Sequence, residues 1–255
     1  MLRKSMLLAV AAVLLGTAAY AQTADELIAK NLDARGGKAK INAIKSAKVT
    51  GKMTAGPGME APFTWEWKRP NAFRMEFVVQ GMTGVQASDG TTGWIVMPFM
   101  GKKDPEKMSD EDMKNSADQA DFEGPLVDYK AKGHTVEFVG KEDIEGTPAY
   151  KLKLTKKTGD VSFIYLDADS YLQIKEVGKM TVRGEEHEFE GSLGDYKEVD
   201  GVLMPFSMEN KPKGAPAGQT ITIEKIELNS SEPADRFSMP EVKPAPAEAP
   251  KPPAH

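Results

Sequence analysis

The chain has 255 residues, with 33 basic and 38 acidic side chains, a formal net charge of −5 and no cysteine. The missing cysteine excludes a disulfide framework, a thiolate nucleophile, a cysteine-ligated metal and the lipid-modified cysteine of an anchored lipoprotein. The acidic balance argues against nucleic acid, and against an anionic membrane surface as the main partner.

The first residues have the pattern of an export signal. Arg3 and Lys4 give a positive start, residues 6–15 form a short apolar stretch, and Ala19-Tyr20-Ala21 is a small-x-small cleavage pattern. The apolar stretch is too short to span a bilayer comfortably. We therefore expect residues 1–21 to be a cleaved signal peptide. The mature protein is then periplasmic or, alternatively, secreted, with no transmembrane segment.

Residues 22–239 are expected to form one domain that begins with a helix. Thr23 and Glu26 match a capping box ahead of an amphipathic segment, and Gly36-Gly37 tolerates the left-handed backbone that ends helices. A short second helical turn follows. Residues 47–97 then alternate apolar and polar side chains in short runs cut by turn residues, which predicts a meander of antiparallel strands.

Residues 102–132 break this alternation. Ser109 and Asp112 match a second capping box, and residues 122–129 have the pattern of a loop that enters another short helix, with Pro125 in its first turn. We expect this insertion to be helical and to cover the sheet.

Strands return after the insertion. The most regular stretch is residues 162–210, where period-two runs are separated by turn pairs such as Asp200-Gly201. We expect the fold to end at Phe237, and the Pro/Ala-rich residues 240–255 to be a disordered tail. Strands outside the regular stretch are expected at residues 135–143, 149–155 and 220–228. The pattern predicts a mainly β, α+β fold.

No catalytic or metal-binding pattern stands out. His187 lies between Glu186 and Glu188, whose side chains should point to the opposite face of a strand, and paired-histidine spacing is missing. No Gly-x-Ser-x-Gly nucleophile elbow occurs. We expect no catalysis, no metal and no cofactor. A hydrolase would need clustered His, Asp and Ser side chains on one rim.

Large apolar side chains on the predicted strand faces are the remaining signal. Each is ordinarily a core residue. A strongly curved sheet, however, would enclose more apolar face than short helices can fill, and would leave a groove lined by adaptable methionine and aromatic side chains. The candidate ligand-binding residues are Trp65, Trp67, Phe73, Met75, Phe77, Trp94, Met180, Phe206 and Met208.

Five short segments carry a resemblance to a known family. They are Arg35-Gly36-Gly37, residues 122–126 (FEGPL), residues 165–172 (YLDADSYL), Gly194-Asp195-Tyr196 and residues 201–206 (GVLMPF). With these segments in this order, the chain from about Thr23 to Pro240 resembles the outer-membrane lipoprotein-sorting proteins of the LolA/LolB-like superfamily.

The resemblance implies an unclosed antiparallel β-barrel, a half-barrel, with the N-terminal helix and the helical insertion as a lid over an apolar cavity. It implies a periplasmic carrier of acylated cargo, lipoprotein or lipid, with inner- and outer-membrane envelope proteins as further partners. Each CH₂ removed from water is worth about 0.8 kcal/mol, so a few buried methylenes give useful affinity. The alternative is a non-catalytic envelope interaction module, with a filled barrel, that binds a protein through an edge strand or the tail.

Overall fold

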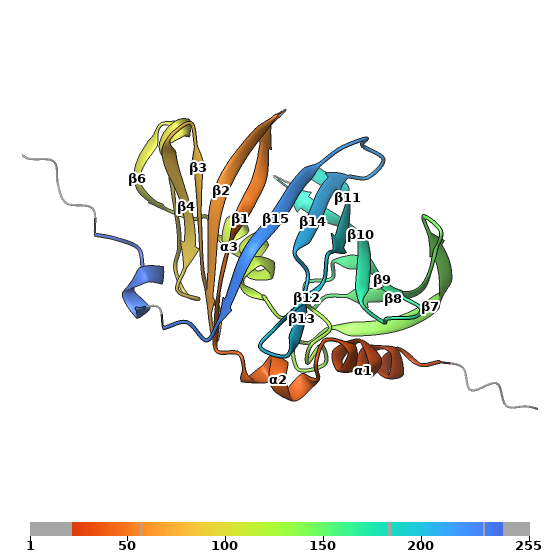
Figure 1. Cartoon of the computed structure of the whole chain (residues 1–255). Coiled ribbons are helices and arrows are strands. Elements are labelled where there is room, and N and C mark those ends of the chain that lie inside the picture. Colours follow the sequence, from red (N-terminus) through yellow and green to blue (C-terminus); the bar gives the residue numbers. More distant parts are fainter. Residues whose placement is uncertain (1–21, 57, 183–184, 232, 242–255) are drawn as a thin grey trace, which may run out of the picture.

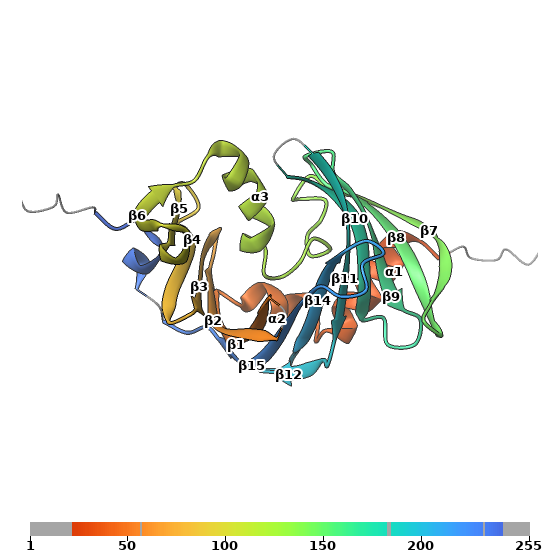
Figure 2. The same ribbon diagram turned by 90° about the horizontal axis from the view of Figure 1, so that it is seen from above.

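The alternating segments pair into one large, strongly curved antiparallel sheet, which the computed structural model describes over residues 22–56, 58–182, 185–231 and 233–241 (Figures 1 and 2). The predicted signal peptide and residues 242–255 of the predicted tail lie outside these ranges. No helix in the described ranges is long and apolar enough to cross a membrane. The helices are α1 (Ala24–Ala34), α2 (Lys38–Ala43) and α3 (Asp110–Ala120), with 3₁₀ turns η1 (Pro98–Met100) and η2 (Ala234–Phe237).

The strands before and just after η1 form successive antiparallel pairs, most of them joined by tight turns. They are β1 (Ser46–Gly56), β2 (Met59–Lys68), β3 (Ala72–Val79), β4 (Met82–Ser88), β5 (Gly93–Met97) and β6 (Lys102–Lys107).

The strands of the second run follow α3 and a turn-rich segment. They are β7 (Thr135–Ile144), β8 (Thr147–Thr155), β9 (Val161–Asp167), β10 (Gln173–Val182), β11 (Glu185–Gly194), β12 (Lys197–Val199), β13 (Val202–Met204), β14 (Ser207–Pro212) and β15 (Gln219–Leu228).

The two runs meet where β1 pairs with β15, so the sheet has the order β6-β5-β4-β3-β2-β1-β15-β14-β11-β10-β9-β8-β7. The edge strands β6 and β7 are not paired with each other, so the barrel is open, and β12 and β13 form a separate small hairpin. The predicted mainly β half-barrel with helices is confirmed. Because sequential neighbours pair, its register follows largely from the turns.

Helices α1 and α2 pack against one face of β8 and β9, which we call the inner face. The capping box at Thr23 is present: its hydroxyl accepts from the Glu26 backbone N–H at 3.2 Å, and the Glu26 carboxylate accepts from the Thr23 backbone N–H at 3.0 Å. Burial of this aliphatic core, rather than helix propensity, holds the short helices in place. Its fully buried members include Leu27, Ile41, Leu152, Leu154, Ile164 and Leu166.

The other half of the inner face is built from β1, β2, β3, β14 and β15. Phe63, Phe73 and Ile223 are buried there, and Trp67 reaches α3 through a hydrogen bond from its Nε1 to the Gln119 carbonyl at 2.6 Å. Figure 2 shows α3 on the inner side of β2 to β4. This half is therefore covered by α3 and the segment after it, and not by α1.

The outer face of β2 to β5 carries a third cluster. Trp94 is buried with Val85 and Ala87, and its Nε1 donates to the Phe237 carbonyl of η2 at 3.0 Å. Arg236 pairs with the fully buried Glu66 at 2.5 Å. The segment around Phe237, together with Met239, thus packs on the outer face of the sheet.

Three local predictions need correction. The predicted helical insertion begins instead with the strand β6, whose charged sequence KKDPEK suits an exposed sheet edge. The prediction of a short helix in residues 122–129 is wrong. Those residues form turns, because Gly124 and Asp128 adopt φ of +91° and +50°, outside the helical region. At α3, Ser109 Oγ accepts from the Asp112 N–H at 3.1 Å, but its hydroxyl also donates to the Asp112 carboxylate at 2.7 Å, so the reciprocal half of the predicted box is not made.

Candidate functional site

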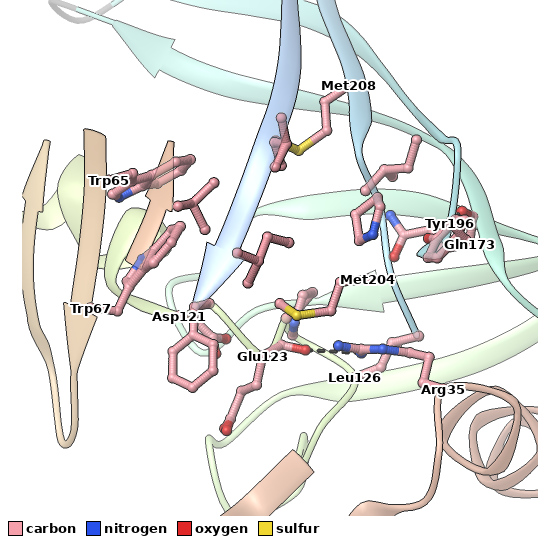
Figure 3. Close-up of a pocket in the computed structure, with 18 of the residues that line it drawn as sticks. Arg35, Trp65, Trp67, Asp121, Glu123, Leu126, Gln173, Tyr196, Met204 and Met208 are labelled. Carbon is pink, nitrogen blue, oxygen red and sulfur yellow. Dashed lines mark hydrogen bonds between the residues drawn. The ribbon is translucent and has the colours of Figure 1, made fainter. Parts of the chain in front are cut away.

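A cavity of about 210 Å³ lies on the inner face, beneath residues 119–126, which we call the cover segment (Figure 3). Strands β1, β2, β14 and β15 supply its floor, and the cover segment and the β12–β13 hairpin complete its wall. The apolar side chains that line it are Val49, Trp65, Trp67, Phe122, Leu126, Leu193, Met204, Met208, Ile223 and Ile226.

Two tryptophans form the aromatic side of the cavity. Trp65 and Trp67 lie in contact, with ring centroids 4.3 Å apart, and Phe122 of the cover segment is 6.1 Å from Trp67. They share a face because they are two residues apart on β2. Trp65 Nε1 and Gln119 Oε1 are buried without hydrogen-bond partners in the described part of the chain. This side therefore holds one spare donor and one spare acceptor.

The opposite side of the cavity is polar (Figure 3). The Tyr196 hydroxyl donates to the Gln173 carbonyl at 2.8 Å, and burial raises the pKa of Tyr196 to about 12. Arg35 Nη1 donates to the Glu123 carbonyl at 3.0 Å. Burial lowers the pKa of Arg35, although nearby Tyr196 and Glu123 oppose that change. The guanidinium nevertheless stays charged at neutral pH.

Local backbone geometry fixes Arg35 at this place. Arg35 is the C-terminal cap of α1, and its carbonyl accepts from the Leu203 N–H of the β12–β13 hairpin at 2.9 Å. Gly36 follows with φ of +110°, and a Cβ there would lie 2.1 Å from the Gly201 carbonyl oxygen. Only glycine allows that approach. The Arg35-Gly36-Gly37 motif thus docks α1 on the hairpin and directs Arg35 to the cavity.

Ion pairs hold the cover segment from the side away from the cavity. Arg69 pairs with the Glu123 carboxylate, and Lys132 lies 3.2 Å from the same carboxylate. Lys132 also pairs with Asp121 at 2.7 Å and donates to the Gly124 carbonyl at 2.9 Å. The acidic side chains of the cover segment are therefore committed to these two cations, and the segment presents Phe122 and Leu126 to the cavity.

The structure places eight of the nine sequence-predicted residues in three environments. Trp65, Trp67 and Met208 line the cavity. A second group packs in the core of the same half without lining it: Phe73, Met75, Phe77 and Phe206. Trp94 lies on the outer face, and Met180 belongs to β10, but its side chain is outside the described part of the structure.

The predicted set misses most of the residues that line the cavity, among them Arg35, Gln173, Tyr196 and Met204. A signal for three of these four exists, because Arg35, Tyr196 and Met204 stand in segments that carry the family resemblance. Within the described ranges, no group of three or more His, Asp and Glu side chains is placed to hold a metal ion.

Comparisons with known proteins find no matching family model and no matching curated protein. Solved structures do match. A LolA superfamily protein from Nitrosomonas europaea superposes with a TM-score of 0.54 at 14% identity, covering 86% of this chain and 98% of that one. A DUF1329 family protein from Desulfovibrio piger gives 0.55 at 13% identity, covering 82% and 95%.

A third structure, an outer-membrane lipoprotein-sorting protein domain from Vibrio parahaemolyticus, gives a TM-score of 0.54 at 11% identity and covers 83% of this chain and 97% of that one. At such identities the likeness shows a shared fold and no shared activity. The chain therefore has the open half-barrel fold seen in LolA superfamily and lipoprotein-sorting structures.

Proposed function

We propose that this protein is a non-catalytic, periplasmic carrier or binder of acylated cargo, either a lipoprotein or a lipid. The observation that carries the proposal is the inner-face cavity, where Trp65, Trp67 and Met208 border open space. An acyl chain placed there gains about 0.8 kcal/mol for each CH₂ that leaves water.

The size of the cavity indicates that the cover segment moves when a long chain enters. About 210 Å³ is below the roughly 300–1,000 Å³ of typical small-molecule sites. The polar contacts that hold the segment are few, and they are Trp67 to Gln119, Arg35 to Glu123, and the pairs made by Arg69 and Lys132, while Leu126 anchors its end in the aliphatic core. Displacing a turn-rich segment costs less than displacing a packed helix.

Two further observations support an envelope carrier. The fold is shared with structures named for lipoprotein sorting. The first 21 residues have the sequence pattern of an export signal. A carrier also needs no nucleophile or base, which fits the lack of a catalytic motif in the sequence.

A protein-interaction module is the second candidate, and one observation favours it. The edge strand β7 has no neighbour on its outer side among the described strands, and Val139 on it is 45% exposed. An exposed edge of this kind can accept a strand from a partner. The two candidate functions differ in the role of the cavity, because a carrier binds its cargo there and a protein-interaction module does not.

The test is native mass spectrometry with lipid extraction, applied to protein purified from the periplasm without detergent. We expect a stoichiometric acyl-bearing species in the parent protein and its loss in Trp65→Glu. Val139→Glu is the matched control, because it places the same charge on an apolar side chain outside the cavity. Circular dichroism checks that both variants fold. A parent protein that is empty and does not bind an added fatty acid would leave the interaction module as the better account.

A further inference from the structure

Arg35 is a cation in an apolar cavity without a counter-ion. In the described part of the chain, no carboxylate lies within ion-pair distance of its guanidinium, and its side chain makes one hydrogen bond, to the neutral Glu123 carbonyl. The Arg35 side chain is half-buried, so part of its hydration is lost without a directly paired charge in return. A cation kept in that position is suited to an anion that arrives from outside.

The nearest acidic side chains are not available to Arg35. The Glu123 carboxylate is bound by Arg69 and Lys132, and the Asp121 carboxylate is bound by Lys132. Guanidinium has five N–H donors in a planar fork, which matches the two oxygens of a carboxylate or phosphate. Arg35 uses one of these donors in its described contacts, so several remain for a ligand.

The position of Arg35 in the cavity determines how a bound ligand would be oriented. Arg35 and Tyr196 stand on one side of the cavity, while Trp65 and Trp67 stand on the other (Figure 3). A ligand that spans the cavity therefore meets a cation at one end and aromatic rings at the other. The arrangement is that of a site for an amphiphile.

We propose that the cavity selects an anionic single-chain amphiphile, with a carboxylate or phosphate head on Arg35 and the acyl or alkyl chain against Trp65 and Met208. This inference rests on the proposed acyl-binding function and narrows its cargo. A neutral head, such as an ester or an alcohol, leaves the Arg35 donors unpaired. Such a ligand binds through its chain alone.

The test is isothermal titration of the mature protein with four ligands that share one chain: laurate, lauryl phosphate, methyl laurate and lauryl alcohol. We expect one or both anions to bind at least about tenfold more tightly than the neutral pair, the range that charged hydrogen bonds provide. If only laurate or only lauryl phosphate binds more tightly than the neutral ligands, that result identifies which anionic head the site takes. Arg35→Met should remove the preference, so that the anions and the neutral pair bind with affinities within about twofold of each other. Lys40→Met, on the neighbouring helix α2, removes an exposed cation as the matched control and should keep the preference.

The ratio between anionic and neutral ligands is the decisive quantity, because loss of the Arg35 bond to Glu123 also loosens the cover segment and changes all affinities together. Arg35→Lys keeps the charge without the planar fork and should retain part of the preference for anions. It provides a second test of the role of Arg35 in case Arg35→Met does not fold. Equal binding of all four ligands by the parent protein would overturn the anionic head and leave the acyl carrier standing. Binding of none would remove the carrier itself, and this inference with it.

Discussion

The two halves of the inner face differ in what covers them. Over β8 and β9, helices α1 and α2 leave Leu152, Leu154 and Ile164 with no exposed surface. Over β1, β2, β14 and β15, the cover segment leaves a cavity of about 210 Å³. The same sheet is therefore a closed core at one end and an open site at the other.

The composition of the covering elements explains this difference. Helix α1 projects Leu27, Ile28 and Leu32 from one face, and such a face interdigitates with aliphatic strand residues. The cover segment contains Gly124 and Pro125, which make no such row, and its acidic side chains turn away toward Arg69 and Lys132. The open space over β1, β2, β14 and β15 thus follows from covering that part of the sheet with the end of α3 and a run of turns instead of an amphipathic helix face.

Leu152→Ala should give the largest effect, because it opens a void in the closed half. We expect the free energy of unfolding to fall by about 2–5 kcal/mol, measured by urea denaturation. Met208→Ala in the open half is the comparison and should cost about 1 kcal/mol or less, since its side chain already borders open space. Equal losses would mean that the two halves are packed alike.

Tyr196 provides a pH test of the open half. The folded protein holds the Tyr196 proton to about pH 12, whereas the unfolded chain releases it near pH 10, because burial raises the pKa. Between these values the unfolded state binds fewer protons, so stability falls as pH rises. Relative to Tyr196→Phe, the parent protein should lose about 2–3 kcal/mol across that window. Parallel pH profiles for the two proteins would show that Tyr196 is hydrated.

Thr23→Ala tests the helix that closes the other half. It removes the capping hydroxyl of α1 and should cost between about 0.5 and 2 kcal/mol. The same variant compares the two halves of the inner face. Hydrogen exchange of the backbone amides should rise along α1 and stay unchanged at Gln119 in the cover segment. A uniform rise over both regions would contradict their independence.

Trp67→Phe should give the smallest loss of stability. It keeps an aromatic ring in the cavity wall and removes the Nε1 bond to the Gln119 carbonyl, which costs about 0.5–1.5 kcal/mol. Hydrogen exchange in the cover segment should rise selectively. Trp94→Phe is the matched control, since it removes a similar bond to Phe237 on the outer face and should leave the cover segment unchanged.

Sequence patterns predict the strands well, because alternation and turn pairs are local. Strand β6 escapes prediction since its charged residues do not alternate with apolar ones, and its state depends on pairing with β5. The placement of Trp94 and Trp65 on opposite faces of the sheet is not determined by local sequence either. Trp94 stands opposite Ala87 and Ala87 opposite Arg74, so the register of three strands turns Trp94 to the outer face.

The site is less predictable than the fold for the same reason. Trp65, Trp67 and Met208 can be chosen for size and strand position, but only tertiary packing decides that they line this cavity while Phe73 does not. From the sequence alone, Arg35 at the end of a helix is expected to be exposed to solvent. Its place in the cavity arises from the docking of Gly36 against Gly201, at the other end of the chain.

The three tryptophans allow the most direct test of the acyl site. A fatty acid brominated along its chain quenches indole fluorescence on contact, and Trp65 and Trp67 line the cavity while Trp94 is buried on the outer face. We predict strong, saturable quenching of the parent protein, and almost none in the double variant Trp65→Phe, Trp67→Phe, whose emission comes from Trp94. Titration with the unbrominated acid corrects for changes in structure. Quenching that persists through Trp94, or none in the parent protein, would contradict an acyl chain bound in this cavity.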